Sequence, residues 1–155
     1  MWRCNSGFSL SDEEKIARYS LWGGMPPLQC RCAFNRTRES FLATELRIAD
    51  THWSRLVGLL GTSRDNFSPG VGLWIVPCYG VHTFGLRFPI DIVYLDSNQT
   101  VIHIEENVKP WRIAPVCLQA STVLELPSHV VWDTRTQSGD SIEILESAEQ
   151  ASGDQ

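Results

Sequence analysis

The chain has 155 residues, 43% of them hydrophobic, and a formal net charge of −5, which fits a single globular domain and excludes a disordered, collagen-like or coiled-coil protein. Six of its acidic residues lie after residue 132, where they face one arginine. The first 132 residues hold twelve basic and twelve acidic side chains. This balance predicts no nucleic-acid partner, because such binding depends on an excess of positive charge.

Five cysteines are an odd number, and none are spaced as CxxC, which argues against a disulfide framework and against a zinc ribbon. We therefore expect free thiols in a reducing compartment, no metal and no cofactor. No apolar run reaches the roughly twenty residues that span a bilayer, and the N-terminus lacks the apolar segment of a signal peptide. These features predict a soluble, cytoplasmic protein with no membrane span.

The first 32 residues differ in pattern from the rest. A short helix capped by Ser11 is followed by GGMPPLQ, which breaks any continuation. We interpret 1–32 as a disordered appendage, and Met25 is an alternative translation start to Met1. The domain is expected over 33–145, with an acidic flexible tail over 146–155.

Regular patterns begin at Phe41, where alternating apolar residues up to Ile48 predict one half-buried strand. A helix over 50–60 is predicted next, because its apolar residues recur at helical spacing on one face, namely Trp53, Leu56, Val57 and Leu60.

The remaining elements read as short strands separated by turns, and Asp96–Gln99 is predicted to form a hairpin turn. Many short strands and one early helix indicate an antiparallel β-sandwich or barrel. The expected strands are 71–76, 90–95, 100–104, 121–126 and 141–145.

The segment 78–96 carries several polar side chains in an otherwise apolar run. Asp91 lies in the strand 90–95, which is apolar on both faces and is therefore expected to be central. A carboxylate there must be paired or hydrogen-bonded. One interpretation is structural, with Asp91 accepting backbone N–H groups from the turn at Phe88 and Pro89 or pairing with Arg87 or another arginine; the other is a cleft carboxylate.

The run GLWIVPCYGVHTFGLRFPIDIVYLD, followed by ENVKPWR at 106–112 and VLELP at 123–127, resembles the domain of unknown function 192 family (DUF192), also called uncharacterised protein family 0127 (UPF0127). The resemblance covers about residues 40–145. It implies a β-sandwich of jelly-roll type, and it matches Asp91 to the central aspartate of the family and Glu125 to a recurring glutamate. It implies no catalytic role for either residue.

Two functions follow as hypotheses. The first is a non-catalytic binding or assembly module, whose small polar cleft accepts a polar ligand, a glycan or a protein partner. The second is a hydrolase with Asp91 or Glu125 as general acid/base and His82 assisting. We favour the module, because a fold resemblance identifies no reaction. The expected ligand-binding residues are His82, Thr83, Arg87, Asp91 and Trp111.

Overall fold

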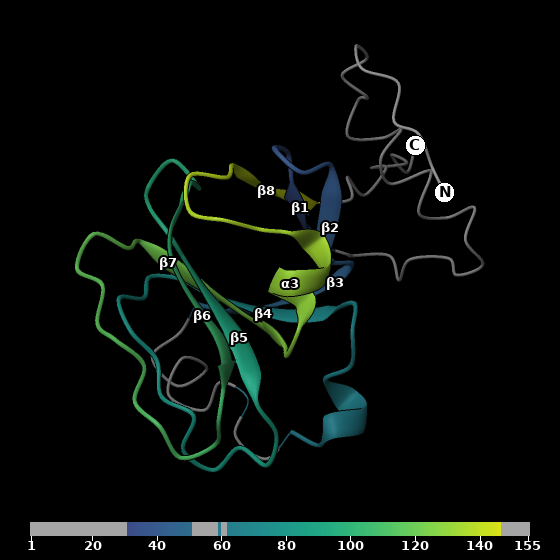
Figure 1. The fold of residues 1–155 in the computed structure, drawn as a ribbon, viewed down its shortest axis with the longest axis vertical. Helices are drawn as coiled ribbons and strands as arrows, with labels where there is room; N and C mark the ends of the chain where they lie inside the picture. The colour runs from purple at the N-terminus through teal and green to yellow at the C-terminus, as the bar shows by residue number, and fades with distance from the viewer. Residues whose placement is uncertain (1–30, 51–58, 60–61, 147–155) are drawn as a thin grey trace, which may run out of the picture.

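The computed structural model describes residues 31–50, 59 and 62–146. These residues form two β-sheets and one short α-helix (Figure 1). The five strands expected after residue 70 are present, and each of their ends lies within four residues of its predicted position. In chain order the elements are β1 (Arg31–Asn35), β2 (Ser40–Ala43), β3 (Glu45–Ala49), the 3-10 helix η1 (Arg64–Asn66), β4 (Val71–Ile75), β5 (Ile90–Leu95), β6 (Val101–Val108), β7 (Thr122–Pro127), α3 (Val130–Thr134) and β8 (Ile142–Glu146).

The fold is mainly β and sandwich-like. A three-stranded sheet in the order β2-β1-β8 faces a five-stranded sheet in the order β3-β4-β7-β5-β6. The expectation of a wholly antiparallel arrangement is corrected, because β3 pairs with β4 in parallel. The five-stranded sheet is therefore mixed.

The predicted strand that begins at Phe41 is split in two at Thr44. The backbone N–H groups of Thr44 and Glu45 both donate to the carbonyl of Gly70, at 2.8 and 2.9 Å. This pair of bonds bends the chain, so that β2 stays in the small sheet and β3 enters the large one. Close packing accompanies the bend, because a Cβ on Gly72 would stand 2.9 Å from the side chain of Ala43.

Strands β5 and β7 form the centre of the large sheet, and all of their residues are buried. The prediction that 90–95 is a central strand is thus confirmed. The hairpin at Asp96–Gln99 is also present: the Asp96 carboxylate accepts the N–H groups of Asn98 and Thr100 at 2.8 and 2.9 Å, and β5 pairs antiparallel with β6.

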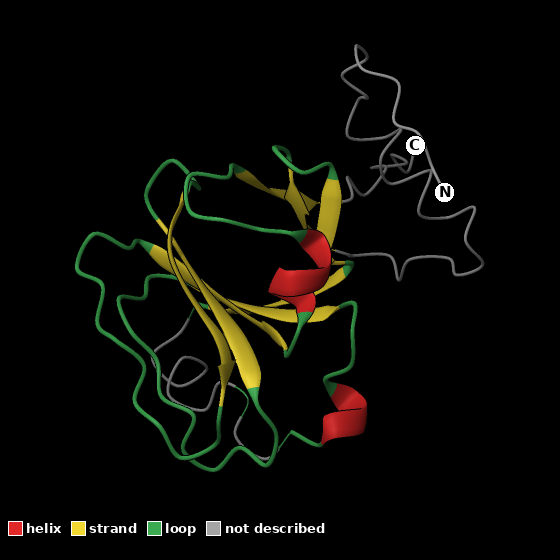
Figure 2. Cartoon of the chain, in the orientation of Figure 1, coloured by secondary structure: helices red, strands yellow, loops and turns green. Residues whose placement is uncertain are grey.

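Each face of the five-stranded sheet covers a separate apolar cluster. Val93, Leu124 and Leu126 belong to the cluster that lies between the two sheets and also includes Val130 and Val131 of α3. Ile92 and Tyr94 belong to the other cluster, which is closed by residues of the connecting loops. In Figure 2 these long loops run along one flank of the sheet, away from α3. The sheet therefore has an inner face toward its partner sheet and a loop-covered face.

The described helix α3 was not predicted. The expected helix over 50–60, with its apolar residues Trp53, Leu56, Val57 and Leu60, falls almost wholly on 51–58 and 60–61, which lie outside the described residues. No helix in the described ranges is long and apolar enough to cross a membrane.

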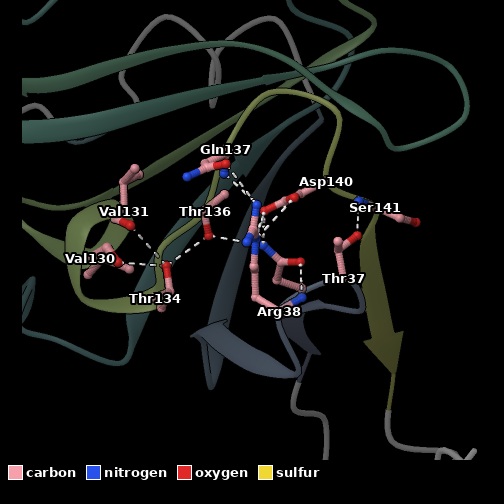
Figure 3. Close-up of polar contacts among 10 residues, drawn as sticks. Thr37, Arg38, Val130, Val131, Thr134, Thr136, Gln137, Asp140 and Ser141 are labelled. Carbon is pink, nitrogen blue, oxygen red and sulfur yellow. Dashed lines mark hydrogen bonds and ion pairs between the residues drawn. The ribbon is translucent and has the colours of Figure 1, made fainter.

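A buried polar network joins the turn after β1 to the segment before β8 (Figure 3). Asn35 is fully buried, and its side-chain amide donates to Thr136 at 3.1 Å and to Asp140 at 3.0 Å. The Asp140 carboxylate also accepts the Arg38 guanidinium at 3.0 Å and the Gln137 N–H at 2.9 Å. The network satisfies each of these groups and fastens the small sheet to the loop that follows α3.

Candidate functional site

Two connecting loops, 77–89 between β4 and β5 and 109–121 between β6 and β7, lie side by side on the loop-covered face (Figure 1). We call them the loop pair. Backbone hydrogen bonds join them along their length, including Cys117 N–H to the Tyr79 carbonyl at 2.7 Å and Ala114 N–H to the Val81 carbonyl at 3.0 Å. The loop pair thus behaves as a short antiparallel ribbon rather than as two independent loops.

Thr83 fastens one end of this ribbon. Its side chain is buried, its hydroxyl donates to the Lys109 carbonyl at 2.8 Å, and the same oxygen accepts the Arg112 N–H at 2.9 Å. Its backbone carbonyl accepts the Trp111 N–H at 3.0 Å. Thr83, expected to contact ligand, is therefore inaccessible and instead holds the two loops together.

Three exposed rings stand around this anchor: His82, Phe84 and Trp111, which we call the aromatic platform. The ring centroids of His82 and Phe84 are 5.0 Å apart, and those of Phe84 and Trp111 are 6.0 Å apart. Trp111 is 66% exposed and Phe84 is 41% exposed. Rings at this spacing interact with one another, yet they leave broad apolar area open to solvent.

Phe84 is the residue of this platform that sequence reasoning missed. It lies two positions after His82 in the same loop, and the expected set already held His82 and Trp111. The available signal was only its place between His82 and Gly85, because Phe88 in the same loop is buried.

Asp91 lies beneath the surface and is fully buried. One carboxylate oxygen accepts the Asn107 N–H at 2.8 Å, and the other accepts the Val131 N–H at 3.0 Å. The sequence predicted backbone N–H donors at the turn of Phe88 and Pro89 or a pairing with Arg87; the donors are instead in β6 and in the first turn of α3. A helix start has unsatisfied N–H groups, so Asp91 serves as a cap supplied from a distant strand.

Glu125 does not lie with Asp91. Residues directly opposite each other in a ladder share a face: Asp91 pairs with Leu126, whereas Glu125 pairs with Ile92. The two carboxylates therefore point to opposite faces of the same sheet, Asp91 inward and Glu125 toward the loop-covered face. This placement does not join them in one acid/base site.

Glu125 is 4% exposed, and its Oε2 has no hydrogen-bond partner. Burial raises the pKa of Glu125 from 4.5 to about 8, because the charged form is poorly solvated there. Nearby, Tyr94 donates to the Pro115 carbonyl at 2.7 Å, which ties the loop pair to β5. Burial, followed by the charge of Glu105, raises the pKa of Tyr94, so its hydroxyl stays protonated.

Three cations belong to the same two loops as the platform. Arg87, Lys109 and Arg112 are exposed and make no ion pair with other described residues. Of the remaining histidines, His103 pairs with Glu105 at 2.8 Å, and His129 precedes α3. Within the part of the chain that the structure describes, no group of three His, Cys, Asp or Glu side chains is placed to hold a metal ion.

Comparison with known proteins gives one family and several relatives. Residues 33–144 match DUF192, described as Uncharacterized ACR, COG1430. A UPF0127 protein of Thermococcus sibiricus is 27% identical over 70% of this chain and 71% of its own length. A UPF0127 protein of Pyrococcus horikoshii is 31% identical over 63% of this chain and 85% of its own.

Two solved structures share the fold. A protein of unknown function from Novosphingobium aromaticivorans has a TM-score of 0.63 at 17% identity, over 73% of this chain and 82% of its own. A protein of Sinorhizobium meliloti, proposed to be a transcription regulator, has a TM-score of 0.62 at 21% identity, over 79% and 98% of the two chains. At these identities the likeness establishes the fold alone.

Proposed function

We propose that this chain, which belongs to the DUF192 family, is a non-catalytic binding module whose contact surface is the loop pair. The resemblance drawn from the sequence is confirmed by the family match over 33–144, and the relatives are themselves uncharacterised. The observation that carries the proposal is the aromatic platform: three neighbouring rings, left open to solvent, on a backbone that the buried Thr83 immobilises. Rigid aromatic side chains lose little entropy on binding.

The residues divide by role. His82, Phe84 and Trp111 contact the ligand, and Arg87 and Arg112 favour an anionic group on it. Thr83 and Asp91 act as positioning residues, since both are buried and each carboxylate oxygen of Asp91 accepts a backbone N–H group. Of the partner classes expected from the sequence, this surface favours one that presents apolar and negatively charged groups together.

The hydrolase alternative draws no support from the geometry. Its candidate carboxylates, Asp91 and Glu125, lie on opposite faces of the sheet, and both are buried while His82 is exposed. A general base must come within hydrogen-bond reach of its proton. A binding module requires no such convergence.

Three further points belong to the proposal. The domain spans 33–145, flanked by the 1–32 appendage and the 146–155 tail; the described strands run from Arg31 to Glu146. The sandwich is of jelly-roll type. The location is cytoplasmic, which the odd cysteine count supports. Limited proteolysis tests the boundaries: we expect early cuts only outside 33–145, and a cut within 33–145 as early as those in 1–30 contradicts them.

A ligand panel tests the function. Binding of a neutral oligosaccharide, heparin, an acidic peptide and anionic vesicles to the full chain is measured by titration of intrinsic fluorescence. We expect at least one anionic member to bind, and Trp111→Ala to weaken it by about tenfold, as loss of an interface hot-spot side chain does.

The matched control is Trp132→Ala. Trp132 is 75% exposed on α3, away from the loop pair (Figure 1), so its removal should leave binding unchanged. Equal weakening by both substitutions, or no binding by any member of the panel, overturns the proposal.

A further inference from the structure

Exposed large apolar side chains concentrate on the loop pair. Among the described residues seven are exposed, and six of them lie on these two loops; the seventh, Trp132, is on α3. Scattered exposed apolar residues are ordinary, but a group confined to one surface marks an interaction site. The six are Tyr79 at 53%, Phe84 at 41%, Trp111 at 66%, Ile113 at 72%, Val116 at 66% and Leu118 at 83% exposed.

The loop pair is anchored on its inner side, so the outer side chains do not have a place in the core. Ala114 and Ala120 are buried in the cluster on the loop-covered face, and the Pro115 carbonyl accepts the Tyr94 hydroxyl. Collapse of Ile113 or Leu118 inward would require these contacts to break. The exposed apolar side chains are therefore a fixed property of the folded surface.

Part of the backbone of the loop pair is already hydrogen-bonded within the protein. Hydrogen bonds between the loops use N–H groups of Thr83, Trp111, Ala114 and Cys117. Unpaired backbone groups are costly to remove from water. These four N–H groups are already paired, so moving them out of bulk water leaves none of them without an acceptor.

The charge of this surface is opposite to that of the chain as a whole. Loops 77–89 and 109–121 contain Arg87, Lys109 and Arg112 and no aspartate or glutamate, whereas the chain carries a net charge of −5. The nearest exposed acid along the chain is Glu106, on β6. The loop pair is thus locally cationic as well as apolar.

This combination distinguishes among the possible occupants. A second copy of the chain, docked by the same surface, would bring like charges together. A single-stranded nucleic acid would use the rings and cations but not the aliphatic side chains of Ile113, Val116 and Leu118. An anionic bilayer uses all three: aliphatic side chains enter the acyl boundary, Trp and Tyr lie at the headgroups, and Lys and Arg meet the lipid phosphates.

We infer that the loop pair docks the protein, peripherally and reversibly, on an anionic lipid bilayer. This inference rests on the proposed binding function and names the partner. Ile113, Val116 and Leu118 insert, Trp111 lies at the interface, and Lys109 and Arg112 contact anionic headgroups. The sheet and α3 stay in water.

Vesicle flotation of the full-length protein tests the inference. Vesicles of phosphatidylcholine alone are compared with vesicles that also contain phosphatidylglycerol. We expect flotation with the anionic vesicles, reduced by salt because the charge contribution is screened, and little flotation with phosphatidylcholine alone.

Two double variants separate the contributions. Lys109→Gln with Arg112→Gln should weaken binding to anionic vesicles by about twentyfold or more, at about fivefold for each cation near the surface. Ile113→Ser with Leu118→Ser should weaken it by at least about tenfold. On binding, the fluorescence of Trp111, obtained as the difference between the parent and Trp111→Phe proteins, should shift to shorter wavelength. The double serine variant should abolish this shift. Both changes are at exposed positions, so unfolding is not expected.

Matched controls remove the same groups elsewhere. Arg64→Gln with Arg135→Gln removes two charges from η1 and from the end of α3, and Trp132→Ser removes an exposed ring. Neither should change flotation by more than about twofold.

The inference is overturned if the parent protein fails to float with anionic vesicles, or if the controls weaken flotation as much as the loop variants do. Binding to heparin or to an acidic peptide that depends on Trp111, without flotation, overturns the bilayer as partner and leaves the proposed binding function standing. Failure of every ligand overturns both.

Discussion

The two faces of the five-stranded sheet treat buried carboxylates in opposite ways. On the inner side, Asp91 accepts two backbone N–H groups, and Asp140 in the adjoining network accepts Arg38, Asn35 and Gln137. On the loop-covered side, the Oε2 atom of Glu125 has no partner. A carboxylate with hydrogen-bond or ion-pair partners stabilises the fold when it is charged, whereas a buried carboxylate without a partner destabilises the fold when it is charged. The inner side is therefore built for stability.

The comparison extends to the surface. The buried polar side chains of the Asn35–Asp140 network (Figure 3) are matched to one another. The loop pair instead presents apolar side chains to water, an arrangement that contributes nothing to folding. Exposed apolar side chains are unfavourable for an isolated protein in water but are useful for binding. The inner face of the sheet therefore serves as the scaffold, and the loop-covered face carries the contact surface.

The largest effect is expected from Asp140→Ala. The substitution leaves Arg38, the Asn35 amide and the Gln137 N–H without their acceptor, a loss of about 3–5 kcal/mol in the free energy of unfolding. Urea denaturation measures it, with the exposed Asp65→Ala in η1 as control. A loss below about 1 kcal/mol would place the network among ordinary surface contacts.

The substitution Glu125→Gln tests the buried carboxylate on the loop-covered side of the sheet. Burial holds the pKa of Glu125 at about 8, against 4.5 in the ordinary state, so the folded form binds the proton more tightly. Stability from this group is complete below pH 4.5 and is lost as the pH rises through 8. Above that pH the glutamine variant should be more stable than the parent by a few kcal/mol, at about 1.4 kcal/mol for each tenfold difference in proton affinity.

Asp140 should respond to pH in the opposite direction. Burial raises the pKa of its carboxyl, but the hydrogen bonds from Arg38, Asn35 and Gln137 and the Arg38 charge outweigh it, and the net pKa is lowered. Its contribution is present above pH 3.8, the ordinary value, and is lost as the pH falls through the lowered pKa. Thermal midpoints across pH would show that Glu125→Gln removes the fall in stability between pH 4.5 and about 8 and leaves the fall below pH 3.8 unchanged. A variant that removes the fall below pH 3.8 instead contradicts this assignment.

Asp91→Asn should have an intermediate effect. The amide retains one acceptor oxygen but turns an NH₂ group toward a backbone donor, at Asn107 or at Val131, which costs about 1–3 kcal/mol. For a domain of this size that lowers the thermal midpoint by several degrees. An unchanged midpoint would mean that the carboxylate is kept for a ligand rather than for the cap of α3.

The smallest effect is expected on the loop pair itself. Leu118→Ser removes a side chain that is 83% exposed. The free energy of unfolding of the variant should therefore stay within about 0.5 kcal/mol of that of the parent protein. Chemical denaturation checks this. A loss comparable to that of Asp91→Asn would show that the side chain packs in the fold.

Local patterns allowed the strands to be predicted but not their partners. The apolar run of β5 and the turn at Asp96–Gln99 depend on neighbouring residues, and both were predicted correctly. The parallel pairing of β3 with β4 depends on the bend at Thr44, which arises from a carbonyl at Gly70, far along the chain. The helix α3 is only five residues long and begins at an N–H group capped by Asp91, so its local pattern was too short to indicate it.

For the candidate site, as for the strands, the sequence indicated the segment involved but not which of its side chains are buried. The motif around His82 drew attention to loop 77–89, because polar groups in an apolar run are unusual. The sequence did not show that Thr83 is buried or that Phe84 is exposed, and it left the structural and ligand-binding interpretations of Asp91 both open. Which side of a loop faces water depends on what packs beneath it, and this information lies in distant segments such as Tyr94 and Pro115.

The pairing of β1 with β8 places Arg31 opposite Glu146, so the first and last described strands lie adjacent in one sheet. Facing residues of an antiparallel pair are about 5 Å apart, a gap that a short peptide can bridge. The domain is thus suited to circular permutation, with new termini opened between the exposed Ser97 and Asn98 of the hairpin turn. It is equally suited to insertion as a cassette into a host protein, with the loop pair left unaltered.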